Sequence, residues 1–233
     1  YKQQVSTVIL ERFKYSIVLM LVAWCFSGIV GFLIGVLAGI YKGGLFDKII
    51  KIFCLALQSA PTFWIGLLIL SLFSVYLGWF PIGFAVPMGK LSLEITIWDR
   101  IYHLILPALT LSILGISRVT LFTRQKLIEI LNSDFILFAK ARGENTRQLV
   151  IRHGLRNIAL PAITEQFASF SELFGGIALA ETVFSYPGLG TATTAAGLNG
   201  DVPLLLGIAI FSAIFVFVGN FIANILYSIV DPR

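Results

Sequence analysis

Two acidic residues stand in an otherwise uncharged stretch of this chain. Glu165 and Glu172 are the only ionisable side chains within residues 157–180. An ionisable group in hydrocarbon costs about 3 kcal/mol or more and usually faces a helix bundle interior or water. Seven residues is about two helical turns, so a continuous helix would place both acids on one face. We consider two interpretations of Glu172: a residue that faces a water-filled path, or a protonated or hydrogen-bonded strut between helices.

The other reactive residue types do not form a catalytic or metal-binding pattern. The chain has two histidines, His103 and His153, and two cysteines, Cys25 and Cys54, all far apart in the sequence. Metal sites need clustered His, Cys, Asp or Glu ligands, and nucleophilic catalysis needs a Ser/His/Asp-type set. The G-x-x-x-x-G-K-[ST] phosphate-binding loop is also missing from the sequence. We therefore expect no catalytic residue, no metal and no cofactor in this chain.

The composition indicates a membrane protein. Of the 233 residues, 58% are hydrophobic and 12% are charged, and the mean hydropathy is +0.92. Soluble domains usually carry about 25% charged residues. These values exclude a disordered chain and an ordinary cytosolic enzyme. The net charge of +5 could suggest a nucleic-acid partner, but the positions of the basic residues favour a membrane.

The apolar runs predict an all-α fold in one transmembrane domain, residues 1–233. A helix needs about 20 mostly apolar residues to cross a bilayer. Five segments meet this requirement with few or no charges: 15–41, 52–78, 101–123, 157–181 and 203–230.

The basic residues predict the orientation of these spans. Eleven bases lie between the first two spans or around the segment that joins the third and fourth: Lys42, Lys48, Lys51, Arg118, Arg124, Lys126, Lys140, Arg142, Arg147, Arg152 and Arg156. Residues 79–100 hold two bases, Lys90 and Arg100, and residues 182–201 hold none. The positive-inside rule places the basic segments in the cytoplasm, and loops 79–100 and 182–202 outside. We interpret residues 1–14 as an external interfacial segment that follows a spanning helix absent from this sequence; a count wrong by one is the alternative.

A stripe of small residues in the first span predicts close helix packing. Gly31, Gly35 and Gly39 recur every four residues, a spacing that lets a second helix approach closely. We interpret this stripe as helix packing without a transport role.

The predicted external segment after the fourth span contains turn residues. SYPGLG (185–190) predicts a turn, and the small and polar residues that follow predict a short external helix before Asp201 starts the last span. The uncharged length of this segment indicates a plug or scaffold at the outer mouth, with Pro187, Gly188, Gly190 and Asp201 as candidate residues. A loop without such a role is the alternative. Glu181, just before it, is predicted near the outer surface and joins Glu165 and Glu172 as a candidate for the translocation path.

The cytoplasmic segment 132–156 predicts two short helices. Helix-starting residues occupy 132–134, and Phe135, Phe138 and Ala139 then follow at spacings that give an apolar stripe. Gly143 predicts the end of this helix, and a second helix is predicted from about Thr146. The small residues of AKARG (139–143) offer a surface that another protein could grip. The alternative is a basic loop that lies on the membrane.

At this point the chain resembles the dipeptide, oligopeptide and nickel branch of ABC importer permeases. The resemblance rests on SDFILFAKARG (133–143) with IRHGLRNIALPAIT (151–164), on ETVFSYPGLG (181–190) with DVP (201–203), on SAPTFWIGLLILSLFSVYLGWFP (59–81) and on the final DPR (231–233). It implies a type I importer bundle with a family core of six spanning helices, of which the first is absent here. It also implies a second permease subunit, two cytoplasmic ATPase subunits that bind ATP and Mg, and an external solute-binding protein.

The resemblance further implies that the short cytoplasmic helix docks on the ATPase and couples ATP hydrolysis to transport. The residues that carry this role over are Asp134, Phe135, Phe138, Ala139, Lys140, Ala141, Arg142 and Gly143. The chain departs from the general family signature where Leu137, Phe138 and Ala139 replace Glu-Ala-Ala. It departs from this branch at Gly200, where the branch often has an arginine.

The expected protein is thus a non-enzymatic, multi-pass subunit of a bacterial or archaeal inner membrane. Its expected substrate is a short peptide, with nickel or a metal chelate as the alternative. A secondary transporter that works without ATP is the alternative from another class.

Overall fold

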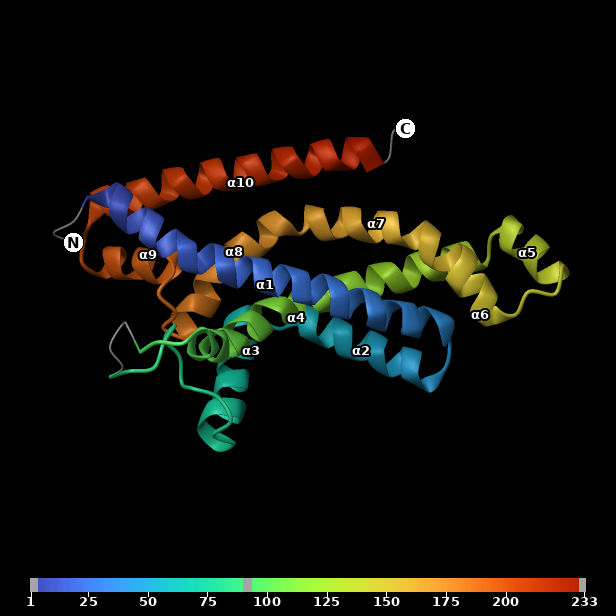
Figure 1. Ribbon diagram of the computed structural model, residues 1–233, viewed down its shortest axis with the longest axis horizontal. Helices are drawn as coiled ribbons and strands as arrows, with labels where there is room; N and C mark the ends of the chain where they lie inside the picture. The colour runs from blue at the N-terminus through green and yellow to red at the C-terminus, as the bar shows by residue number, and fades with distance from the viewer. Residues whose placement is uncertain (1–3, 90–93, 231–233) are drawn as a thin grey trace. The chain divides into compact units, whose positions relative to one another are not determined.

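The computed structural model describes residues 4–89 and 94–230, and within these ranges the chain folds into helices without any strand (Figure 1). The helices are α1 (Val5–Ile40), α2 (Leu45–Ser59), α3 (Thr62–Ile69), α4 (Ile97–Leu131), α5 (Asp134–Ala141), α6 (Thr146–Gln148), α7 (Leu155–Ala168), α8 (Phe170–Val183), α9 (Leu189–Leu198) and α10 (Val202–Val230), with two π-helical segments, η1 (Leu70–Tyr76) and η2 (Leu149–Gly154). Lys90, used above for the orientation, and the terminal DPR lie outside the described residues.

The chain forms two compact units. The first unit comprises Tyr1–Trp24, Ala60–Ser112 and Ser171–Asn220, and the second comprises Cys25–Ser59, Ile113–Phe170 and Phe221–Arg233. Each unit is described separately below.

Three of the described helices are long and apolar enough to cross a membrane: α1, α4 and the part of α10 from Val202 to Ile222. The interrupted pair formed by α2 and α3–η1 would supply a fourth span. Large apolar side chains on these helices are exposed, for example Ile29 on α1 and Ile210 and Phe217 on α10. Such exposed apolar surface is unfavourable in water and is expected for helices that face lipid.

The second predicted span, 52–78, is not one continuous helix. Helix α2 ends at Ser59, and α3 begins at Thr62. Pro61 lacks an N–H and disfavours the helical conformation of Ala60, so the helix is interrupted at this pair. The end of the segment is close to the predicted one, because η1 ends at Tyr76 and Gly78, two residues later, adopts a positive φ of 63°.

The fourth predicted span, 157–181, is also interrupted. Helix α7 ends at Ala168 and α8 starts at Phe170. Between them the hydroxyl of Ser169 donates to the carbonyl of Gln166 at 2.8 Å, a local bond that competes with the helical pattern. Glu165 and Glu172 therefore belong to different helices and different units, and the argument that they share a helix face was wrong.

Helix α1 begins ten residues before the predicted start of the first span. Charged residues between positions 11 and 14 end the apolar run in the sequence, but charge does not stop a helix whose other face is buried. In the first unit, Val8 and Ile9 of α1 pack with the buried face of α9, including Ala192 and Ala196, and with Leu204 of α10. Residues 5–14 are thus part of a packed helix rather than a separate interfacial segment.

The glycine stripe of α1 faces α4 in the second unit. A Cβ atom added at Gly31 would lie 2.8 Å from Cβ of Val119, and one added at Gly35 would lie 2.7 Å from the carbonyl oxygen of Thr120. A Cβ at Gly39 would lie 2.8 Å from a methyl group of Leu127. Backbones approach this closely only when one helix presents glycine, as small-residue stripes do in membrane helix pairs.

Candidate functional site

Helix α5 forms a short hairpin with α6 and η2 between the end of α4 and the start of α7 (Figure 1). It starts after Ser133, whose hydroxyl donates to the carbonyl of Ile130 at 2.5 Å rather than to the first turn of α5. Its C-terminal end is closed by two bonds, from the N–H of Gly143 to the carbonyl of Lys140 and from the N–H of Glu144 to the carbonyl of Ala139. This is the Schellman arrangement, which needs a left-handed residue, and Gly143 supplies it with a φ of 92°. The predicted end at Gly143 is confirmed.

The apolar residues of α5 divide between two faces. Ile136 and Ala139 are buried and pack with Leu149 of η2 and with the last turn of α4. Phe135, Leu137 and Phe138 are exposed, Phe138 to 74%. The predicted stripe of Phe135, Phe138 and Ala139 was wrong, because every residue from 135 to 139 is apolar and periodicity alone cannot tell the inner face from the outer one.

Four other predicted residues of this segment are exposed. Asp134, Lys140, Ala141 and Arg142 lie at the ends of α5 with their side chains accessible. Together with the exposed aromatic residues they give α5 an outer surface that is apolar in its middle and charged at its ends.

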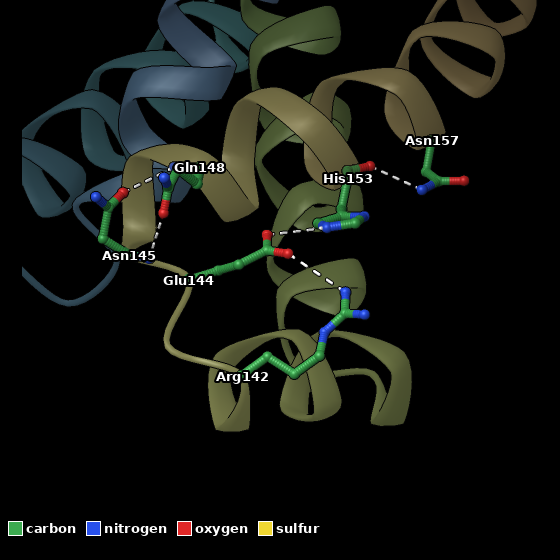
Figure 2. A network of polar contacts seen from close by, with 6 residues as sticks. All are labelled: Arg142, Glu144, Asn145, Gln148, His153 and Asn157. Carbon is green, nitrogen blue, oxygen red and sulfur yellow. Dashed lines mark hydrogen bonds and ion pairs between the residues drawn. The ribbon is translucent and has the colours of Figure 1, made fainter.

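A polar network joins the C-terminal end of α5 to η2 (Figure 2). The carboxylate of Glu144 lies 3.1 Å from Nε2 of His153 and 3.4 Å from Nη2 of Arg142. Next to it, Asn145 and Gln148 form a reciprocal capping box at the start of α6. This box confirms the helix start predicted at about Thr146.

The three predicted path acids have different surroundings. In the second unit, Glu165 of α7 forms an ion pair of 3.0 Å with Arg118 of α4, and both side chains remain partly exposed. In the first unit, Glu172 is exposed on the first turn of α8. Glu181 is fully buried in the first unit. Whether any of them lines a path stays a prediction.

Glu181 joins three elements of the first unit. Its Oε1 accepts a hydrogen bond of 2.5 Å from the hydroxyl of Ser16 on α1. The same hydroxyl accepts a hydrogen bond of 2.8 Å from the N–H of Leu189. Its Oε2 accepts one of 2.6 Å from the N–H of Gly190 at the start of α9. A Cβ added at Gly188 would lie 1.9 Å from Oε1 of Glu181, so the carboxylate fills the space that a side chain there would need.

The rest of the predicted external loop surrounds this carboxylate or starts α10. Pro187 is half-buried in the turn before α9. Asp201 accepts a hydrogen bond of 3.1 Å from the N–H of Leu204 and thereby caps α10. Both positions fit the predicted turn and the predicted start of the last span.

The ion pair between Asp47 and Arg124 was not predicted from the sequence. In the second unit, the guanidinium of Arg124 on α4 contacts both carboxylate oxygens of Asp47 on α2. The second carboxylate oxygen of Asp47 also accepts from the N–H of Gly43 at 2.8 Å, and Asp47 is almost fully buried. The two residues are 77 positions apart, so no local spacing could have paired them.

Comparison with known proteins identifies the family. The model of the family described as "binding-protein-dependent transport system inner membrane component" matches residues 31–233. The chain belongs to this family. It is therefore a transport permease subunit and a multi-pass inner-membrane protein, which agrees with the resemblance deduced from its motifs.

Individual permeases of this family are similar over nearly the whole chain. An oligopeptide transport system permease protein, AppB, of Bacillus subtilis is 37% identical over 98% of this chain and 72% of its own length. A di/tripeptide transport system permease protein, DppB, of Pseudomonas aeruginosa is 34% identical over 96% of this chain and 71% of its own length. The dipeptide permease DppB of Escherichia coli is 31% identical over 95% of this chain and 71% of its own length.

A solved structure has the same fold. A chain of the inward-facing MetNI methionine ABC transporter matches with a TM-score of 0.74 and covers 99% of this chain, at 16% sequence identity. All of the matched chain is included in the superposition. The all-helical fold predicted for an importer permease is thereby confirmed.

Removing the Asp47 carboxylate should destabilise the permease. Asp47→Ala leaves the mostly buried guanidinium of Arg124 without its partner, and breaking such a pair typically costs about 3 kcal/mol. The matched control is Glu129→Ala, which removes an exposed carboxylate paired with Lys126 on α4 and should change stability by less than about 0.5 kcal/mol. Thermal unfolding of the two purified variants in detergent measures the difference, and equal midpoints would contradict the role of this pair.

Proposed function

We propose that this permease is the membrane-spanning subunit of an ATP-driven importer of short peptides, and that separate ATPase subunits grip its helix α5. Family membership supports the importer class. The names of the three similar permeases support peptides as the substrate, because all three refer to peptide transport. Nickel is not favoured by any of these names.

The observation that carries the proposed coupling is the outer surface of α5. Helix α5 has eight residues, lies in the basic segment of the chain and exposes three large apolar side chains. The exposure of these apolar side chains to water would be unfavourable. The basic residues around α5 support a position in the cytoplasm by the positive-inside rule. A protein partner that covers Phe135, Leu137 and Phe138 removes this exposed apolar surface. An ATPase subunit is the partner expected for this family, and it would bind the ATP and Mg.

The remaining partners are part of the same proposal. A second permease subunit completes the path, and an external solute-binding protein delivers the peptide. Among the described residues no group of three or more His, Cys, Asp or Glu could hold a metal ion, so metal selection by this chain is not supported.

Reconstitution tests the proposal. The chain is purified with its partner permease, ATPase subunits and binding protein, placed in liposomes, and supplied with a labelled dipeptide or with radioactive nickel. We expect ATP-dependent uptake of the dipeptide and no comparable uptake of nickel. Uptake of the dipeptide by the permease alone, without ATP or binding protein, would instead indicate a secondary transporter.

A further inference from the structure

We propose that Glu144 is a positioning residue that ties the coupling helix α5 to helix α7, so that a displacement of α5 is passed on to α7. The inference rests on the proposed function, since it assumes that an ATPase moves α5. It concerns a residue outside the segment 134–143 that the resemblance assigned to ATPase contact.

Glu144 contacts both sides of the α5–α6 connection. Its backbone N–H donates to the carbonyl of Ala139 and closes the end of α5. Its side chain reaches 3.1 Å from His153 in η2 (Figure 2). Because one residue makes both contacts, α5 cannot tilt away from η2 without breaking one of them.

The surroundings of Glu144 favour this position for its carboxylate. Glu144 is the only acidic residue between Asp134 and Glu165, a stretch that contains five lysine and arginine residues. Its side chain is 15% exposed, against 73% for Arg142. A carboxylate in such a basic stretch could remain in water without a free-energy cost. We therefore interpret the burial of Glu144 next to His153 as a specific contact.

The apolar side of α5 makes a second contact with the same segment. Ile136 and Ala139 pack with Leu149, the first residue of η2. The ring of Phe135 meets the ring of His153 edge to face, with centroids 6.4 Å apart. The α5–η2 contact is thus polar at the end of α5 and apolar along its inner face.

The segment that receives this contact is continuous with helix α7. Residues from Thr146 to Ala168 run through α6, η2 and α7 without a break. The side chain of Asn157 on α7 donates to the carbonyl of His153 at 2.7 Å, which fixes His153 to the first turns of α7 (Figure 2). A force on His153 therefore acts on α7, which also carries Glu165.

The connection between α5 and α6 consists of residues 142–145. A Cβ added at Gly143 would meet none of the described residues within 4 Å apart from its own chain neighbours. Such a glycine has a permissive backbone and can act as a hinge. The Glu144 contacts remove this freedom.

The number of peptides imported per ATP hydrolysed tests the inference in the reconstituted importer. Glu144→Ala should lower this ratio by about tenfold, the effect expected when a charge-assisted hydrogen bond is lost. The variant should still capture the ATPase subunits, because the exposed face of α5 is unchanged. Glu144→Gln keeps an acceptor for His153 and should give an intermediate ratio. The control Glu129→Ala removes an exposed acid of α4 and should match the unmodified protein.

A covalent bridge gives a test within one protein. In a chain with Cys25 and Cys54 replaced by alanine, the double change Glu144→Cys and His153→Cys should lower the ratio, and a short thiol cross-linker should restore it. An unchanged ratio before cross-linking, or no recovery after it, would overturn the inference even if Glu144→Ala fails to fold. Absence of ATP-dependent uptake by the unmodified importer would instead reject the proposed function.

Discussion

Replacing Gly190 by alanine is expected to prevent the first unit from folding as observed. The new Cβ would lie 2.3 Å from Cα and 2.7 Å from Cβ of Ala178 on α8. Neither atom is the end of a flexible side chain, so the start of α9 would have to move away from α8. This movement breaks the 2.6 Å hydrogen bond from the N–H of Gly190 to Glu181. Overpacking and the loss of a buried bond to a carboxylate together cost about 3–5 kcal/mol.

A matched variant on the same helix separates this clash from the general effect of alanine. A Cβ added at Gly197 meets no atom of the described residues within 4 Å, and alanine favours a helix over glycine by about 1 kcal/mol. Gly197→Ala should therefore be neutral or stabilising, whereas Gly190→Ala should lose most of the folded protein. The yield of monodisperse protein in detergent and its thermal midpoint measure both. Equal behaviour of the two variants would show that α9 does not pack on α8 as described.

Replacing Phe138 by glutamate is expected to abolish ATPase capture while the permease still folds. Phe138 is 74% exposed, so its side chain contributes little to the packing of this chain. At a protein interface a buried aromatic anchor contributes about 2–4 kcal/mol. We therefore expect the affinity for the ATPase subunits to fall by about 30-fold to 1,000-fold. Binding of purified ATPase subunits to the immobilised permease measures this.

The choice of residue matters for this experiment. Ala139 is only 3% exposed and packs on the inner face of α5 against Leu149. A charge there would therefore disturb folding as well as docking. The control Leu198→Glu replaces an 86% exposed apolar residue on α9 in the predicted external segment and should leave ATPase binding unchanged. Unchanged binding of Phe138→Glu would contradict the proposed docking surface.

Local features of the fold could be predicted from the sequence. The turn at Gly143, the start of α6 and the start of α10 at Asp201 depend on residues within a few positions of one another. Capping and turn chemistry acts over such short distances. The interruption before α3 also had a local signal, Pro61 itself. The long apolar run around it nevertheless favoured the prediction of one continuous span over 52–78.

Features that depend on distant residues could not be predicted. Glu181 looked like a residue near the surface until the fold placed Ser16, 165 positions away, beside its carboxylate. Asp47 and Arg124 are also distant; Arg124 was one of the bases behind the predicted orientation, and nothing in the sequence paired it with Asp47. The inner face of α5 could not be predicted for another reason. Apolar residues occupy both faces of this helix, so the hydrophobic pattern does not distinguish the buried face from the exposed one.

The contact between Ser16 and Glu181 also constrains how the protein is made. Ser16 is synthesised before Glu181 and Gly190, so its hydrogen bond to Glu181 can form only after the chain has been made as far as α8. Long-range contacts of this kind form slowly because a long chain segment must first be ordered. The packing of α1 against this carboxylate therefore forms late, after most of the chain has been synthesised.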